Sequence, residues 1–221
     1  GAGEHRLMRE TWAGPVTDEA ADLAVVSSER VFEGMVWDVR RDEVELGDGQ
    51  TVTREVIAHT GAVGAIVLDG QDRVLLLRQY RHPVRSYLWE PPAGLLDVPG
   101  EDAWAAARRE LEEEAHLRAE QWWVLADFYL TPGASEEAFR CYLARGVSEV
   151  PDDEVHHGEG EEREMPSVWL PLDEARDLVL AGRLHNPSAV VGILAACAAR
   201  ETGWSTLRPP DAPWPERSPG R

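Results

Sequence analysis

The sequence predicts an α/β protein with a small antiparallel β unit at its N-terminus. Short β-rich runs alternate with turn signals over residues 22–58, and apolar, strand-like runs recur from residue 62 onward. Strong helix formers fill residues 103–115. We expect four parts: an N-terminal extension that can include part of an expression tag (1–20), the β unit (21–58), a main domain (59–205) and a proline-rich C-terminal tail (206–221).

The predicted β unit and the first strands of the main domain follow one another closely. Turn signals at Gly34 and at residues 47–49 divide the unit into three expected strands, 23–28, 35–40 and 51–59. Runs 62–68 and 73–81 are joined by Asp-Gly-Gln-Asp, which predicts a hairpin. Four successive apolar residues at 74–77 indicate a strand that is buried on both faces.

The remaining elements are predicted in order along the chain. A Pro/Gly-rich loop at 90–94 precedes a helix that Asp102 can cap. Two strands (121–130 and 138–144), an acidic loop (149–164) and a further strand (167–170) follow. Two amphipathic helices (172–184 and 187–202) come next. The tail (207–221) contains five prolines and is expected to be an extended or mobile appendage.

Composition limits the classes of function. The chain has 221 residues, of which 43% are hydrophobic, so it can bury a substantial core. A formal net charge of −19 argues against nucleic acid or an anionic membrane surface as a partner. Cys141 and Cys197 lie in apolar contexts and are expected to be packing residues. No signal peptide or 18-residue apolar stretch is present, which predicts a soluble, cytoplasmic protein.

Three carboxylates in the predicted helix carry the chemical signal. Glu110, Glu113 and Glu114 have the spacing i, i+3 and i+4, which places them on one helical face. Like charges at this spacing repel by a few tenths of a kcal/mol per pair. A stripe of oxygen ligands suits Mg²⁺ or Mn²⁺. The alternative is a solvated surface tied by ion pairs to nearby Arg108 and Arg109, and a glutamate-rich helix alone would favour that interpretation.

The surrounding pattern reverses this preference, because residues 94–117 resemble the Nudix box, G-x5-E-x7-R-E-U-x-E-E-x-G-U with U aliphatic. The matching residues are Gly94, Glu101, Arg109, Glu110, Leu111, Glu113, Glu114 and Leu117. Two departures exist. Six residues instead of five separate Gly94 from Glu101, and His116 replaces the second glycine, where histidine tolerates a left-handed conformation at modest cost.

The resemblance implies a fold, a cofactor and residue roles. The fold would be the α/β/α Nudix sandwich with a mixed sheet, and the cofactor two or three Mg²⁺ or Mn²⁺ ions. Glu110, Glu114 and the backbone carbonyl of Ala93 would be metal ligands, with Glu113 alongside as a further ligand or catalytic carboxylate. Gly94, Glu101 and Arg109 would be structural and would brace the loop and the helix.

Features outside the box resemble the ADP-ribose pyrophosphatase branch over roughly residues 20–200. They are the N-terminal β unit and the segments 53–56, 78–83, 89–94 and 131–133. By this resemblance Arg54 and Arg81 would contact the adenylate and diphosphate, for which the planar guanidinium is suited. Glu90 would lie near the metal or the terminal ribose, and Gly133 would belong to the substrate site. Trp37 is one candidate platform for adenine.

The same branch takes a general base from a late loop, here the acidic residues 149–164. Counting back from the Trp-Leu-Pro at 169–171 favours Glu162, then Glu161, then Glu164, although most acids in such a loop simply solvate it. His156 and His157 are further metal-ligand candidates, but adjacent histidines in a loop are more often unbound.

The predicted function is metal-dependent hydrolysis of the diphosphate of ADP-ribose to AMP and ribose 5-phosphate. One alternative is a Nudix hydrolase of another nucleoside diphosphate sugar or dinucleotide. Another is a non-catalytic ligand sensor, which the intact glutamates disfavour. A third, an accidental match on a surface helix, would require the whole box pattern to be coincidental. The resemblance also implies a homodimer in which the N-terminal β unit is exchanged between subunits.

Overall fold

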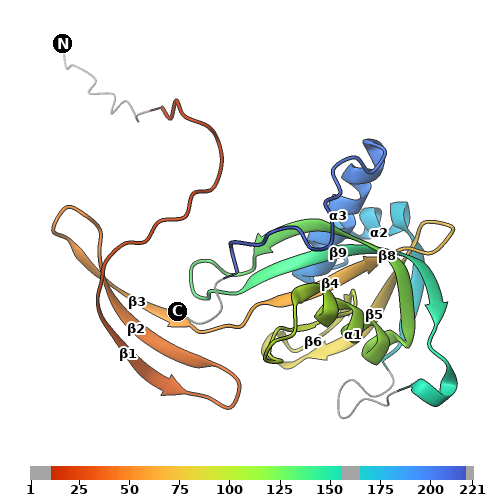
Figure 1. Cartoon of the computed structure of the whole chain (residues 1–221), viewed down its shortest axis with the longest axis horizontal. Helices are drawn as coiled ribbons and strands as arrows, with labels where there is room; N and C mark the ends of the chain where they lie inside the picture. Colours follow the sequence, from red (N-terminus) through yellow and green to blue (C-terminus); the bar gives the residue numbers. More distant parts are fainter. Residues whose placement is uncertain (1–10, 156–164, 218–221) are drawn as a thin grey trace.

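The computed structural model describes residues 11–155 and 165–217, and its N-terminal part is a separate sheet. Three antiparallel strands follow the order β1 (Val25–Glu33), β2 (Asp38–Glu45) and β3 (Thr51–Ile57). Figure 1 shows this sheet projecting to one side of the main body. The predicted three-strand unit is confirmed, but β1 and β2 run several residues further along the chain than the expected 23–28 and 35–40.

The main domain contains a mixed four-stranded sheet with the order β7-β4-β9-β8. Strand β4 pairs in parallel with β9 and antiparallel with β7, and β8 pairs antiparallel with β9. This confirms the mixed sheet. The bounds are β4 (Ala62–Val67), β7 (Ala93–Leu95), β8 (Leu117–Tyr129) and β9 (Ala138–Glu149).

A second sheet of the main domain corrects the predicted hairpin. Strand β5 (Arg73–Arg81) lies between β6 (Ser86–Glu90) and β10 (Ser167–Pro171). The prediction that 62–68 and 73–81 form a hairpin is therefore wrong, because the two strands belong to different sheets and are joined by a single bridge, between Leu68 and Val74. Both edges of β4 and of β5 are already paired with other strands, so neither has an edge left for the other.

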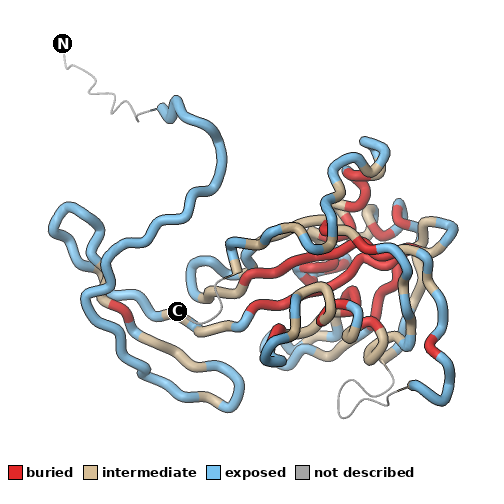
Figure 2. The backbone as a smooth tube through the Cα atoms, in the orientation of Figure 1, coloured by how far each residue is buried: buried red, intermediate tan, exposed pale blue. Residues whose placement is uncertain are grey.

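Helices cover both faces of the strands. Helix α1 (Ala103–Ala115) lies on one face, and α2 (Leu172–Leu180) and α3 (Pro187–Glu201) lie on the other. The side chains of β4 alternate accordingly: Val63 packs in the cluster that contains Leu111, and Ile66 in the cluster that contains Ile193. Residues of β5 alternate between the same two clusters, which confirms burial on both faces. Figure 2 shows the buried residues concentrated in these strands.

Smaller differences from the expected elements have local causes. Helix α2 ends at Leu180, not at 184, because Gly182 adopts a left-handed conformation with φ of 70°. The acidic loop 149–164 begins with a short 3-10 helix, Asp152–Glu154. Another, His82–Val84, joins β5 to β6. Both cysteines are buried and unpaired, as predicted. In the described parts of the chain, no helix is long and apolar enough to cross a membrane.

The C-terminal tail is packed against the domain, and the expectation of a mobile appendage is wrong for its described part. Arg208 forms a backbone bridge with Val124 of β8. Arg140, which is 2% exposed, donates to the carbonyls of Ala212 and Pro213 at 2.6 and 3.0 Å. Its guanidinium also lies 5.0 Å from the Trp214 ring centroid. A buried guanidinium needs acceptors, and the tail supplies two of them.

An Arg140→Ala variant is expected to lower the free energy of unfolding by about 3–5 kcal/mol, because Asp127 would lose its bidentate buried partner. Arg208→Ala is the matched control. Arg208 also pairs with Asp127, at 2.7 Å, but its side chain is 45% exposed, so about 1 kcal/mol or less is expected. Urea unfolding of both variants measures the difference. Equal losses would contradict the assignment of Arg140 as the anchor of the tail.

Candidate functional site

Helix α1 is fixed at both ends, which sets the direction of its glutamates. The side chain of Asp102 accepts a hydrogen bond from the Ala105 N–H at 2.8 Å, so the predicted N-cap is confirmed. His116 ends the helix in the left-handed conformation with φ of 56°, as predicted for the residue that replaces glycine. Glu110, Glu113 and Glu114 lie within the uninterrupted helix between these caps.

Arg109 connects the loop before the helix to the glutamate face. Its Nε and Nη2 atoms donate to the two carboxylate oxygens of Glu101, both at 2.9 Å. Its Nη1 donates to Glu110 at 3.0 Å and to Glu113 at 3.1 Å. The extra residue between Gly94 and Glu101 therefore leaves this pairing intact. The guanidinium also offsets the repulsion expected between neighbouring carboxylates, and the hydrogen bond to Glu101 raises the pKa of Arg109.

The Glu101–Arg109 pair predicts a pH-dependent contribution to stability. The hydrogen bond from Arg109 lowers the pKa of Glu101 below its ordinary 4.5. The stabilisation is then fully present above pH 4.5 and is lost as the pH falls through the lower pKa of the folded state. Glu101→Gln should unfold more easily than wild type at pH 7, by about 1–2 kcal/mol. Thermal unfolding from pH 7 to pH 3 should show this gap closing; a constant gap would contradict the linkage.

Two glutamates of α1 rest on the backbone of β7. A β-carbon on Gly94 would lie 2.1 Å from Oε1 of Glu110, so only glycine leaves room for this carboxylate. The N–H of Ala93 donates to Oε2 of Glu114 at 3.1 Å. The structure thus brings together four residues that the sequence singled out, Ala93, Gly94, Glu110 and Glu114.

This arrangement fits a divalent cation that is only partly enclosed by protein. Among the residues that the structure describes, no three His, Cys, Asp or Glu side chains are grouped so that they could hold a metal by themselves. Mg²⁺ commonly binds through one or two carboxylates and completes its shell with water and substrate phosphate oxygens. Two adjacent glutamates against the β7 backbone are a donor set of that kind, with Glu113 41% exposed beside them.

Arg81 and Glu90 form a second charged group. Glu90 is 3% exposed, and its carboxylate accepts from Nε of Arg81 at 2.8 Å and from Nη2 at 2.5 Å. These residues end β5 and β6, whose register places Arg81 opposite Ser86 and Glu90 opposite Leu77. Burial raises the pKa of Glu137, and the positive charge of Arg81 opposes that change. Arg81 is thus held by a buried carboxylate and lies within electrostatic reach of Glu137.

The sequence interpretation missed a cluster where the N-terminal sheet meets the main domain. Arg40 contacts Glu136 at 3.3 Å, and Nε2 of His59 lies 3.4 Å from Oε1 of Glu137. The His59 ring stacks on Trp37, with centroids 4.5 Å apart and an interplanar angle of 16°. The sequence gives one sign of this cluster, the adjacent carboxylates Glu136 and Glu137 after Thr-Pro-Gly. Their spacing does not reveal that Arg40 and His59 are their partners.

The structure places two other predicted site residues, Arg54 and Gly133, at exposed positions. Arg54 is exposed on β3, and its Nη1 donates to the carbonyl of Thr53 at 2.9 Å. Gly133 is exposed in the turn that the Ala134 N–H closes onto the carbonyl of Thr131. The remaining candidates lie outside the described residues: Glu161, Glu162, Glu164, His156 and His157.

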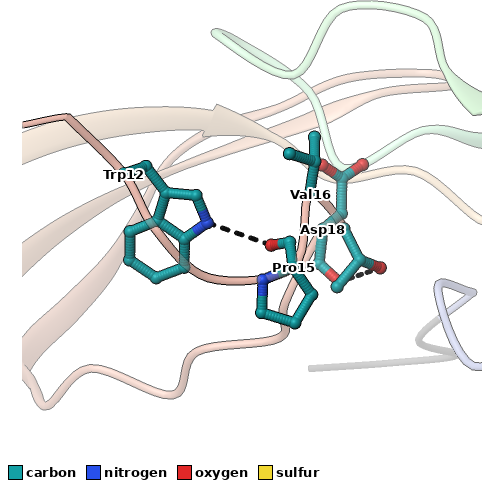
Figure 3. A pocket seen from close by; sticks show the side chains of 5 residues that line it. Trp12, Pro15, Val16 and Asp18 are labelled. Carbon is teal, nitrogen blue, oxygen red and sulfur yellow. Dashed lines mark hydrogen bonds between the residues drawn. The ribbon is translucent and has the colours of Figure 1, made fainter.

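A pocket of about 410 Å³ lies elsewhere, within the N-terminal segment (Figure 3). Its lining residues are Trp12, Pro15, Val16, Thr17 and Asp18. The segment folds back on itself through a hydrogen bond from Nε1 of Trp12 to the carbonyl of Pro15, at 3.0 Å. None of the residues predicted from the sequence for the site lines this pocket, so we do not assign the chemistry to it.

Comparisons with known proteins identify one family. Residues 58–190 match the model of the NUDIX domain. The chain is 43% identical over 196 residues to an ADP-ribose pyrophosphatase of Mycobacterium tuberculosis, covering 89% of this chain and 93% of that protein. It is 34% identical over 168 residues to a methanol dehydrogenase activator of Bacillus methanolicus, covering 76% and 89%.

A solved structure supports the fold. The crystal structure of an ADP compounds hydrolase superposes with a TM-score of 0.70 at 21% identity, covering 85% of this chain and 99% of that one. The family match over residues 58–190 includes both β7 and helix α1, whose Glu114 contacts the β7 backbone. This chain belongs to the NUDIX domain family.

Proposed function

We propose that this protein hydrolyses the diphosphate of ADP-ribose to AMP and ribose 5-phosphate in the presence of Mg²⁺ or Mn²⁺. The observation that carries the proposal is the placement of Glu110 and Glu114 against the backbone of β7. The 43% identity to an ADP-ribose pyrophosphatase over most of both chains supports the choice of substrate. The proposed location is the cytoplasm.

Glu110, Glu114 and the Ala93 carbonyl would hold two or three metal ions, with Glu113 as an additional ligand or catalytic carboxylate. Bound divalent ions neutralise diphosphate charge and orient an attacking water. Gly94, Glu101 and Arg109 keep the glutamate face in place, because Gly94 leaves space for Glu110 and Glu101 fixes Arg109. The carboxylates are thereby set before substrate arrives, which reduces the ordering cost at the time of reaction.

Arg81 is the proposed diphosphate contact, and buried Glu90 fixes its guanidinium plane. Arg54 and Gly133 are proposed as further substrate contacts, and Trp37 as the platform for adenine. Because Arg54 lies on the projecting sheet, its contribution requires that this sheet approach an active site, either its own or that of a second subunit.

Glu162 is the proposed general base, with Glu161 and then Glu164 as the next candidates. In this proposal the base takes a proton from water, whose oxygen attacks one phosphorus. The bond from that phosphorus to the bridging oxygen breaks, and the bridging oxygen leaves on the other phosphate. One AMP and one ribose 5-phosphate result.

A homodimer is the proposed assembly, because strand β1 of the N-terminal sheet packs on nothing within the described chain beyond its pairing with β2. All nine residues of β1 are exposed, including Val26 and Phe32, and so are Met35 and Val36 just after the strand. A small sheet needs an apolar face packed on something to be stable, and exposed apolar patches commonly mark interfaces.

We expect light scattering to give twice the chain mass and a Phe32→Asp variant to shift the protein toward monomer. Glu29→Lys, also on exposed β1 but not apolar, serves as the control for a charge change. A wild-type protein that remains monomeric at micromolar concentration would contradict the dimer.

A substrate panel separates the proposed reaction from its alternatives. Initial rates with ADP-ribose, ADP-glucose, NADH, a dinucleoside polyphosphate and GDP-mannose should give the highest kcat/KM for ADP-ribose. A higher kcat/KM for another compound would keep the diphosphate chemistry and replace the substrate. Binding without turnover of any compound would favour a ligand sensor.

A further inference from the structure

His59 lies between β3 and β4, where the N-terminal sheet joins the main domain, and its ring is held in one orientation. The side chain is 4% exposed. Its Nδ1 accepts a hydrogen bond from the Gly61 N–H at 2.8 Å. Since Nδ1 is the acceptor, the proton of the neutral ring is on Nε2, which faces Glu137 at 3.4 Å.

A neighbouring carboxylate fixes the backbone at the same residue. The main-chain N–H of His59 donates to Oε1 of Glu136 at 3.2 Å, and Glu136 is itself paired with Arg40 of β2. Burial lowers the pKa of His59, an effect that Glu136 opposes. The ring is therefore neutral at pH 7. Contacts at both ring nitrogens and at the backbone N–H fix its plane.

The indole of Trp37 rests on this surface. The ring centroids are 4.5 Å apart and the planes differ by 16°, so the two rings are stacked nearly face to face. Trp37 keeps 37% of its surface exposed. One face of the indole is thus backed by a rigid ring, while the residue remains accessible to a ligand.

We propose that His59 is a positioning residue for nucleoside recognition: it fixes the Trp37 indole as a platform on which the aromatic base of the substrate stacks. The inference rests on the proposed function, because ADP-ribose supplies the base. His59 itself touches neither substrate nor metal in this proposal. Its neighbour Glu137 has a pKa that burial raises and that the positive charge of Arg81, the proposed diphosphate contact, lowers.

Kinetics and AMP binding in full-length variants test this inference. AMP is the probe, and its dissociation constant is measured by isothermal titration calorimetry. His59→Ala should raise both the KM for ADP-ribose and the Kd for AMP by about 3–10-fold, with kcat changed by no more than about twofold. His59→Phe keeps the stacked ring but loses both ring-nitrogen contacts, and it should recover part of the affinity. The exposed His185→Ala serves as the control and should match wild type.

Several results would overturn the inference. For His59→Ala, they are an unchanged Kd for AMP, or a fall in kcat without a rise in KM. For His59→Phe, the contradicting result is a folded protein whose Kd for AMP is as high as that of His59→Ala. Trp37→Ala covers the case in which His59→Ala does not fold, since an unchanged AMP Kd in that variant also excludes the platform. Wild type that releases no AMP from ADP-ribose would instead overturn the proposed function, and this inference with it.

Discussion

Glu114→Gln is expected to lower kcat for ADP-ribose hydrolysis by about 10²–10⁴-fold, with the metal requirement retained. The amide keeps the size of the side chain and can still accept from the Ala93 N–H, now 3.1 Å from Oε2. It loses the negative charge that a divalent ion needs, and metal-dependent stabilisation of this kind contributes several kcal/mol to the barrier. Steady-state kinetics over a Mg²⁺ titration measure the effect, and circular dichroism checks the fold.

Glu112→Gln on the same helix is the matched control. Glu112 pairs with Arg118 at 2.6 Å, away from β7, so its loss should leave kcat close to wild type. The metal-site assignment fails if Glu114→Gln retains full turnover while metal is still required. It also fails if both variants lose activity equally, because the effect would then reflect the helix and not the position of the carboxylate.

Gly94→Ala should reduce kcat/KM by about 10–100-fold while the protein remains folded. The added β-carbon would approach Oε1 and Cδ of Glu110 to 2.1 and 2.2 Å, so the carboxylate must move. The end of a glutamate side chain can swing aside at little cost to folding, and Gly94 does not have a positive φ. A displacement of about 1 Å in a catalytic constellation can nonetheless cost about 10²-fold.

The matched control for this variant is Gly70→Ala. Gly70 lies in the turn between β4 and β5, also without positive φ, and a β-carbon there would meet nothing within 4 Å. It should match wild type in kcat/KM. Parallel measurement of melting temperature separates a shifted carboxylate from an unfolded domain. Gly94→Ala with normal activity would mean that the position of Glu110 is not critical.

Local chemistry explains what could be predicted from the sequence. Helix α1 was predictable because strong helix formers, the Asp102 cap and the left-handed His116 all act within one segment. Burial of β5 followed from its uninterrupted apolar run. The spacing of the glutamates determined their common face, since helix geometry leaves no freedom in that respect.

Long-range partners explain what could not be predicted. The choice of partners for β4 and β5 depends on strands far away in sequence, so a plausible turn between them suggested the wrong pairing. The tail was misjudged because its composition does not reveal that Arg140, about 70 residues earlier, needs its carbonyls. His59 and Glu137 belong to no motif, and only the folded chain places them in contact.

The decisive measurement is chromatographic product analysis of ADP-ribose incubated with the wild-type protein and Mg²⁺, with and without chelator. The proposed function predicts AMP and ribose 5-phosphate in equal amounts, with both products absent when chelator is present. No AMP from ADP-ribose, or AMP formation that chelator leaves unchanged, would contradict it.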